Sequence, residues 1–528
     1  MSASLGGRWG VAMTGVPDDV VIRPEPREPV SDPTVGVPVA TAWQGVPQHR
    51  LVSIGDSLTH GFCSGAIFAT DLSYSAIIAH ELGWDGLRFP TYGGPGGGFP
   101  LNIELLLRDI EQFSGTDLDW WELPVALVRA RGFMDQVEDY WERGAGSRLP
   151  PPSPTNHVLG VYGWDLRDAL ARTADVCAAE IVPPRDDLIS QIVQNNGARA
   201  ALRVLPRTTP ADCRSTAFEA AAALGREAGT DPDHGIETLV VFLGANNALG
   251  AVTSLRVAWS GPGFDDLAHK DAFTVWRPSH FIAELDRVVT EVTAIRARHV
   301  IWCTVPHVTI VPLARGVGDK VSPRSRYFPY YTRPWISDRD FRPGRDPAIT
   351  QDDARAVDSA IDQYNDAITA AVVAARRAGR DWYLLDIAGA LDRLASRRYI
   401  EDPAARPGWW RPYPLPQELA AQHPVPDSRF LTSDGSGRRT GGLFSLDGVH
   451  PTTVGYGIIA QEIIDIMVRA GVRFTRPDGT PRGGAIRVDF TRLIARDTLL
   501  THPPSIVTDG LGVLGWADQA LGLLHRTF

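Results

Sequence analysis

Five short apolar segments, separated by stretches with helical periodicity, constrain the fold of this chain more than any other feature. Each segment is strand-length and barely alternates between apolar and polar residues, as expected for strands buried on both faces of a parallel sheet. They are residues 51–54, 158–161, 238–243, 300–305 and 383–387. Apolar residues recur at helical spacing over 73–82, 282–295, 357–372 and 453–470. This alternation predicts an α/β fold, a three-layer α/β/α sandwich around a mainly parallel five-stranded sheet.

The 528 residues are expected to form one elaborated domain with additions at both ends. Residues 1–48 are proline-rich and lack periodicity, which predicts an extended arm. The main domain is expected over 49–471, and 472–528 are expected to be an extension packed on it. Three long stretches without a strand of the sheet are expected to be loop or helical insertions, at about 84–155, 307–350 and 389–442.

Composition argues against several classes of protein. The chain has 52 Lys and Arg against 62 Asp and Glu, a net charge of −10, and no basic block with interleaved aromatics, so we expect no nucleic-acid partner. The four cysteines form no CxxC pair, which indicates neither a zinc site nor a disulfide framework. No apolar run reaches eighteen residues, and no signal peptide is evident. We expect a soluble cytoplasmic protein without an integral membrane segment, unless another route exports it; its oligomeric state stays open.

Two motifs nearly four hundred residues apart carry the residue types of a serine hydrolase. The first is Gly55-Asp56-Ser57-Leu58, directly after the first predicted strand. The second is Asp447-Gly448-Val449-His450-Pro451, directly before the last predicted helix. Open α/β sheets place their ligands at the carboxyl ends of the strands, where the first motif lies. We therefore predict a triad in which Ser57 is the nucleophile, His450 the general base and Asp447 the acid that orients the imidazole.

Two further strand ends offer donors for an oxyanion hole. Gly163 follows the second predicted strand, and because it has no side chain its N–H can approach a substrate closely. Asn246 follows the third predicted strand and carries a carboxamide donor. Donors that point at the oxyanion lower the barrier to ester cleavage. We predict an oxyanion hole made by the N–H groups of Ser57 and Gly163 and the Asn246 side chain.

These blocks, taken in order along the chain, resemble the motifs of the GDSL, or SGNH, hydrolase superfamily of esterases and lipases. The resemblance covers about residues 49–470, and it implies a flavodoxin-like sandwich with Ser57, His450 and Asp447 as triad and Ser57, Gly163 and Asn246 as oxyanion donors. Two positions depart from the family pattern. Asn247 stands where the family usually has aspartate, and a glycine-rich stretch at 93–98 rivals Gly163 as the second block. We prefer Gly163 and expect the glycine-rich stretch to shape an inserted loop.

Other residues have competing interpretations. Asp56 is expected to be structural, His60 and His307 are weaker candidates for the base, and Asn246 and Asp447 could instead serve a helix cap or a turn. The tryptophan pairs at 120–121 and 409–410 could line an acyl pocket or stack on a sugar, although burial under a long loop is the commoner role of large aromatic residues.

The expected function is therefore a serine ester hydrolase of the carboxylesterase or lipase type, which works through an acyl-enzyme and needs no cofactor or metal. The expected substrate is a small-molecule, lipid or acylated-carbohydrate ester. The same triad would serve an O-acyltransferase or a carbohydrate O-acetyl esterase, and a non-catalytic binding protein on this scaffold is a weaker alternative. A metal-dependent phosphoesterase is disfavoured because the sequence has no Asp-x-His or His-x-His pair.

Overall fold

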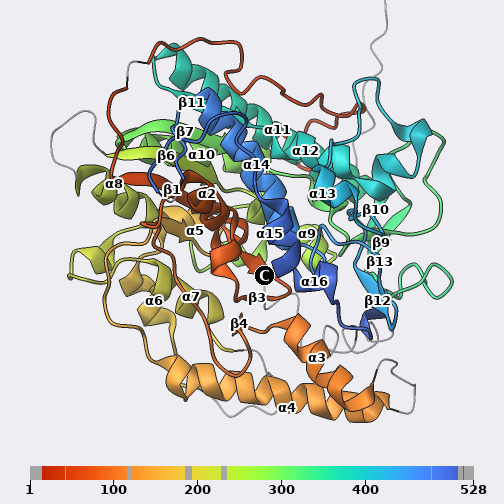
Figure 1. Cartoon of the computed structure of the whole chain (residues 1–528). Coiled ribbons are helices and arrows are strands. Elements are labelled where there is room, and N and C mark those ends of the chain that lie inside the picture. The colour runs from red at the N-terminus through yellow and green to blue at the C-terminus, as the bar shows by residue number, and fades with distance from the viewer. Residues whose placement is uncertain are drawn as a thin grey trace, which may run out of the picture.

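A five-stranded parallel sheet forms the centre of the computed structural model, which describes residues 15–41, 43–115, 122–184, 193–227, 235–476, 478–508 and 515. Its strands are β1 (His49–Gly55), β5 (Val158–Gly160), β6 (Ile236–Phe242), β7 (Ala297–Cys303) and β11 (Trp382–Leu385). They lie in the order β11-β7-β6-β1-β5, of which Figure 1 labels the first four. Numbered along the chain this is the order 2-1-3-4-5, the flavodoxin-like arrangement of doubly wound sheets. All five predicted strands are present, so the expected α/β class is confirmed.

Helices cover both faces of this sheet. The helices α2 (Tyr74–Leu82) and α14 (Thr453–Arg469) pack together on one face, where α2 contacts β1 and α14 contacts β7 and β11 (Figure 1). On the other, α8 (Ala217–Glu227) contacts β1 and β5, α11 (Gln351–Arg377) contacts β11, and α10 (Pro278–Ala294) packs between these helices. Every residue of β1 and β6 is buried, which explains why these strands do not alternate in polarity.

Local sequence signals set the ends of these helices. The hydroxyl of Ser73 accepts a hydrogen bond from the Ala76 N–H at the start of α2, and Gly83 ends the helix in the left-handed conformation at φ +64°. At the start of α11, Thr350 and Asp353 form a capping box that satisfies two otherwise unpaired N–H groups.

The described part of the N-terminal arm contains no helix or strand and lies across α10, α11 and β11. Asp19 accepts a hydrogen bond from Arg277 on this surface, at 2.9 Å. The Val21 N–H donates to Gln363 on α11, and the Leu384 N–H of β11 donates to the Pro33 carbonyl.

The three predicted insertions contain short elements around the sheet. The first holds β4 (Phe99–Pro100), which extends the ribbon of β2 (Phe62–Cys63) and β3 (Ala66–Ile67), and the helices α3 (Ile103–Ser114) and α4 (Leu123–Glu142), which pack together at the lower edge of Figure 1. The second holds β8 (Arg315–Gly316), β9 (Tyr330–Thr332) and β10 (Ile349–Thr350). The third holds most of α12 (Ile387–Leu394), the π-helical turn η6 (Ser396–Ile400), α13 (Gln417–Ala420), β12 (Thr432–Asp434) and β13 (Gly437–Thr440).

The remaining elements connect or follow the strands of the sheet. Between β5 and β7 lie α5 (Leu166–Ala171), α6 (Ala174–Glu180), α7 (Asn196–Val204) and α9 (Asn246–Thr253). After α14 come α15 (Phe490–Arg496) and α16 (Thr498–Thr501). Phe490 and Leu493 of α15 are buried in the same apolar cluster as α14 and the sheet, so the described part of the C-terminal extension packs on the main domain.

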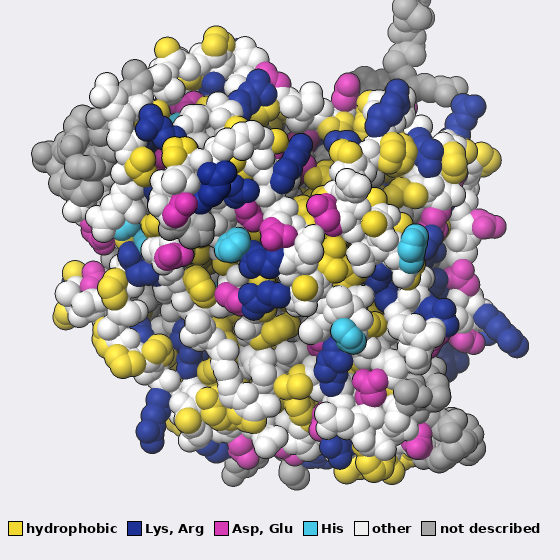
Figure 2. All heavy atoms as spheres, viewed as in Figure 1, with side chains coloured by type: hydrophobic (Ala, Val, Ile, Leu, Met, Phe, Trp, Pro, Cys, Tyr) yellow, Lys and Arg dark blue, Asp and Glu magenta, His cyan; other side chains and the backbone are white. Residues whose placement is uncertain are grey.

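The surface carries mixed charge. On the face in Figure 2, basic, acidic and hydrophobic side chains are interspersed. Within the described ranges, no helix is both long and apolar enough to cross a membrane.

Candidate active site

Ser57 lies at the carboxyl end of β1, as the sequence predicts. It is the first residue of the one-turn helix α1 (Ser57–His60), which begins after Asp56 and ends at Gly61 in the left-handed conformation. The Asp56 carboxylate accepts a hydrogen bond from the Leu58 N–H at 3.0 Å. This bond fixes the turn that presents Ser57, so the structural role expected for Asp56 is confirmed.

The structure brings Ser57, His450 and Asp447 into one hydrogen-bonded chain. His450 Nε2 lies 2.8 Å from Ser57 Oγ, and His450 Nδ1 lies 3.1 Å from Asp447 Oδ2. All three residues are buried, and the Phe62 ring packs on the imidazole with 4.7 Å between ring centroids. In this arrangement the carboxylate can fix the imidazole tautomer that accepts the Ser57 proton.

Asp447 is held in place by more than the imidazole. Its Oδ1 accepts the N–H groups of Val449 and His450, both at 2.8 Å, and its Oδ2 also accepts the Gly65 N–H at 3.0 Å. Burial alone would raise the pKa of Asp447, but His450 and these hydrogen bonds outweigh it and lower the pKa. Asp447 therefore stays ionised and available to orient the imidazole.

A second contact joins the two motifs and was not predicted from the sequence. The Ser64 N–H donates to Ser445 Oγ at 2.8 Å, and the Leu446 N–H donates to Ser64 Oγ at 3.3 Å. This reciprocal pair fastens the loop that carries Asp447 and His450 to the segment after α1. A single serine in a loop gives no periodic signal. The one hint in the sequence is that Ser445 lies two residues before Asp447 and Ser64 lies seven residues after Ser57.

The oxyanion candidates follow the two strands that flank β1. Gly55 is paired with Gly160 of β5 and with Phe242 of β6, so Ser57, Gly163 and Asn246 all follow adjacent strand ends. Gly163 has φ +76°, a conformation that favours glycine. Asn246 Nδ2 donates one hydrogen bond to the Trp164 carbonyl at 2.8 Å, which orients the amide and leaves its second N–H for another acceptor.

Asn247, the departure from the family pattern, is fully buried and has a packing role. Its backbone carbonyl accepts the Trp276 N–H at 2.7 Å, and its side-chain oxygen Oδ1 accepts the Leu166 N–H at 3.4 Å. It therefore connects α9 to the start of α5 and to the segment before α10.

The two alternative histidines have other partners. His60 Nε2 lies 2.9 Å from the Tyr92 hydroxyl, and burial lowers the pKa of His60 to about 3. His307 bonds Asp362 at 3.0 Å; burial lowers its pKa, but Asp358 and Asp362 outweigh this and raise it to about 10. His307 stays protonated near neutral pH and His60 binds protons only weakly, so both are poor general bases. His450, which lies beside Ser57 Oγ, remains the candidate.

The other sequence features have structural roles where they are described. The glycine-rich stretch leads into β4, and a Cβ at Gly94 or Gly96 would clash with Tyr140 or Val137 of α4, so this stretch shapes the inserted loop. Trp410 is buried beside Tyr399, and Trp409 packs against the same small apolar cluster, as expected for core residues. The pair at 120–121 lies outside the described residues.

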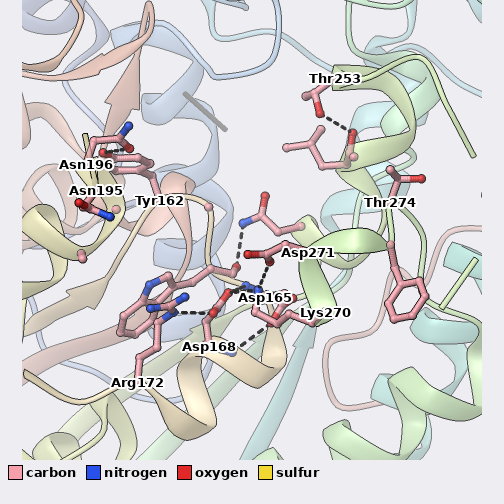
Figure 3. Close-up of a pocket in the computed structure, with 18 of the residues that line it drawn as sticks. Tyr162, Asp165, Asp168, Arg172, Asn195, Asn196, Thr253, Lys270, Asp271 and Thr274 are labelled. Atoms are coloured by element: carbon pink, nitrogen blue, oxygen red, sulfur yellow. Dashed lines mark hydrogen bonds and ion pairs between the residues drawn. The ribbon is translucent and has the colours of Figure 1, made fainter. Parts of the chain in front are cut away.

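Two cavities of opposite character share the wall residue Leu249 of α9. The apolar cavity, of about 130 Å³, has Ser57 and His450 in its wall and is lined mainly by aliphatic side chains of α12, α14 and the segment after β7. Figure 3 shows the polar cavity, which has a volume of about 580 Å³. Gly163 and Asn246 also lie in its wall. Its wall combines amide and charged groups, such as Asn195, Asn196 and Arg172, with the rings of several aromatic residues.

A cluster of buried charges forms one side of the polar cavity. The Lys270 ammonium lies 3.1 Å from Asp165 and 2.9 Å from Asp168, both at the start of α5, and also 2.8 Å from Asp271 (Figure 3). Arg172 contacts Asp168 at 2.7 Å. Lys270, Asp165 and Asp168 are at most 6% exposed, so these charges depend on one another for compensation.

The stability of the protein is expected to fall between pH 5 and 8 because of Asp56. Burial raises the pKa of Asp56 to about 7, and its Oδ2 has no hydrogen-bond partner among the described residues. The unfolded chain releases this proton near pH 4, whereas the folded chain keeps it until about pH 7, so stability falls as pH rises through this window.

We expect Asp56→Asn, which keeps an acceptor for the Leu58 N–H, to remove this dependence. The shift is worth about 1.4 kcal/mol per pH unit. The unfolding free energy of the variant, relative to that of wild type, should therefore rise by roughly 2–3 kcal/mol from pH 5 to pH 8, as measured by urea denaturation. If the difference in unfolding free energy between variant and wild type does not change with pH, Asp56 is ionised over this whole range.

Comparison with known proteins returns no match, whether to a family model, a curated protein or a solved structure. Among the described residues, no group of three or more His, Cys, Asp or Glu side chains is arranged to hold a metal ion. The assignment of chemistry to this site therefore rests on its geometry.

Proposed function

We propose that this protein is a serine ester hydrolase that cleaves carboxylic esters through an acyl-enzyme. The observation that carries the proposal is the buried chain from Ser57 Oγ through His450 to Asp447, with distances of 2.8 Å and 3.1 Å. The resemblance of its motifs to those of the GDSL hydrolases supports the same conclusion, as does the position of Gly163 and Asn246 after the strands on either side of β1.

In the first half of the reaction, Ser57 Oγ attacks the ester carbonyl carbon while its proton passes to His450 Nε2. The carbonyl oxygen becomes an oxyanion, which the N–H groups of Ser57 and Gly163 and the Asn246 amide would stabilise. The bond to the alcohol oxygen then breaks, and the alcohol leaves with the proton from His450. The acyl group stays on Ser57.

In the second half, a water molecule attacks the acyl carbon and gives a proton to His450. The bond between the acyl carbon and Ser57 Oγ breaks, Ser57 recovers the proton, and the carboxylic acid leaves. An acyltransferase would differ only in using an alcohol instead of water at this step.

The two cavities suggest how an ester would lie across the site. The apolar cavity beside Ser57 and His450 suits the acyl chain, and the polar cavity beside Gly163 and Asn246 suits a hydroxyl-rich alcohol. Amide and charged groups next to aromatic rings are the side chains that bind polyols and sugars. This favours an acylated carbohydrate or polyol as the natural substrate, rather than an ester with two apolar ends.

Acyl chains of about six carbons are expected to be the best substrates, because an apolar cavity of roughly this size can hold a benzene molecule. Each buried CH₂ contributes about 0.8 kcal/mol, so kcat/KM should rise roughly fourfold per carbon from acetate, by about 10² to hexanoate, and fall again toward palmitate. Hydrolysis of a p-nitrophenyl ester series would measure this profile.

A variant that fills the cavity tests the placement of the acyl chain. Leu391→Trp in the cavity wall should move the optimum toward acetate, whereas Val468→Trp on the exposed side of α14 should leave the profile unchanged. A profile that is the same in both variants would place the acyl chain elsewhere.

Covalent labelling distinguishes the hydrolase from a binding protein on the same scaffold. A fluorophosphonate should add one phosphonyl group to Ser57, detectable by peptide mass spectrometry, and the labelling rate should fall sharply in His450→Ala. Absence of label from Ser57 together with inactivity toward every ester would contradict the proposal.

A further inference from the structure

A pocket lined by arginines shares the wall residue Val311 with the apolar cavity. It has a volume of about 350 Å³ and lies among the segment before β8, β9, the turn η6 and the segment that leads into β12. Five arginines line it and only one acidic residue, Glu401. The arginines are Arg315, Arg326, Arg397, Arg398 and Arg429.

Three of the five guanidinium groups already have carboxylate partners. Arg315 pairs with Asp338 at 2.6 Å, Arg398 with Asp358 at 2.8 Å, and Arg429 with Glu401 at 2.7 Å. These pairs neutralise part of the charge and hold the guanidinium groups in fixed positions. Glu401, the acidic residue of the pocket, is therefore already engaged.

The other two arginines have no carboxylate partner in the described part of the chain. Arg326 is 5% exposed, and its three guanidinium nitrogens are buried with the hydroxyls of Tyr327 and Tyr399 beside them. Its guanidinium carbon lies 5.0 Å from the centre of the Tyr327 ring, which offsets only part of the cost of burial. Neutral hydroxyls do not cancel the charge of Arg326, which therefore adds to the positive potential of the pocket.

Arg397 has a similar environment. It is half-buried in η6 and its guanidinium lies 4.9 Å from the centre of the Phe328 ring. Burial and then the charge of Arg315 lower the pKa of Arg397, and together they outweigh the opposing charges of Glu401 and Asp338.

We propose that this pocket binds a small anionic molecule that carries a phosphate or carboxylate group, held mainly by Arg397 in the positive potential of the other four arginines. Guanidinium groups donate pairs of hydrogen bonds to both of these anions. The rings of Phe328, Tyr331 and Phe430 in the same wall suit the apolar part of such a molecule. The proposal is independent of the ester hydrolase function, because no residue of the triad lines the pocket.

Isothermal titration calorimetry at low salt, with inorganic phosphate and separately with malonate, tests the site. We expect at least one of them to bind to the wild-type protein, and the preferred one identifies the anion class. Loss of a charge-assisted hydrogen bond should weaken binding about tenfold or more in Arg397→Gln. Arg326→Gln should weaken binding less than Arg397→Gln, because it removes charge from the pocket but no hydrogen bond to the anion. Thermal unfolding curves would show whether this variant folds.

Two controls make the outcome specific to this pocket. Arg345→Gln, an exposed arginine outside the pocket, should bind the anion within about twofold of wild type. Ser57→Ala should bind it as wild type does, which separates this site from the ester hydrolase site. The proposal is overturned if neither anion binds at up to about 10 mM, or if Arg397→Gln binds with unchanged affinity.

Discussion

Ser57→Ala is expected to lower kcat/KM for every ester by about 10⁴ to 10⁶-fold, which corresponds to roughly 5–8 kcal/mol of transition-state stabilisation. The reason is that the variant has no nucleophile for the acyl carbon, while the oxyanion donors and the substrate cavities are retained. Hydrolysis of p-nitrophenyl hexanoate by matched preparations measures the effect.

The structure offers a control and a companion variant for this test. Ser322→Ala, at an exposed serine outside the cavities, should keep wild-type activity. His450→Ala should lose nearly as much activity as Ser57→Ala, and the double variant should lose no more than either alone, because the two residues act as one unit. Wild-type activity in Ser57→Ala would refute the serine mechanism.

Lys270→Met is expected to reduce the free energy of unfolding by about 3–5 kcal/mol. The substitution keeps a side chain of similar length but leaves Asp165 and Asp168 buried without the ammonium that lies 3.1 Å and 2.9 Å from them. Arg172 remains beside Asp168, so the uncompensated charge is mainly that of Asp165. Urea denaturation at pH 8 measures the loss.

The pH dependence of this loss provides a second check. Burial and then the charge of Asp168 already raise the pKa of Asp165 to about 7, and without Lys270 this carboxyl should take up a proton still more readily. The destabilisation should therefore be smaller at pH 5 than at pH 8.

The control is Asp271→Asn, which removes the exposed partner of the same lysine. The Asp271 side chain is 74% exposed, so this change should cost less than about 1 kcal/mol. If Lys270→Met costs no more than Asp271→Asn, the buried cluster is not held together by the lysine.

The sheet could be predicted because its signal is local. The strands are short apolar segments buried on both faces, and the helices between them carry periodic apolar residues with capping signals such as Ser73 and Gly83. Among the insertions, α3 carries a comparable signal, because the Asn102 side chain caps its start and Gly115 ends it, whereas α4 has no capping side chain. The twenty residues of α4 and the small β8–β10 sheet owe their conformation to packing, and they were expected only as loop or helix.

The candidate site, like the fold, could be predicted only in part. Ser57, Asp447 and His450 could be named because the chemistry of a triad requires these residue types and two short motifs carry them. Ser64, Gly65 and Ser445 could not, because their role is to join two loops about 380 residues apart in the sequence.

The sequence by itself determined the α/β class, the strands of the sheet and the residues proposed for the triad, because each depends on neighbours within a few positions. The tertiary structure alone decided that His450 lies 2.8 Å from Ser57, that His60 and His307 are occupied elsewhere, and that an apolar, a polar and an arginine-lined cavity surround the site. These features depend on contacts between distant segments, whose distances and burial are set by packing and have no counterpart in local sequence.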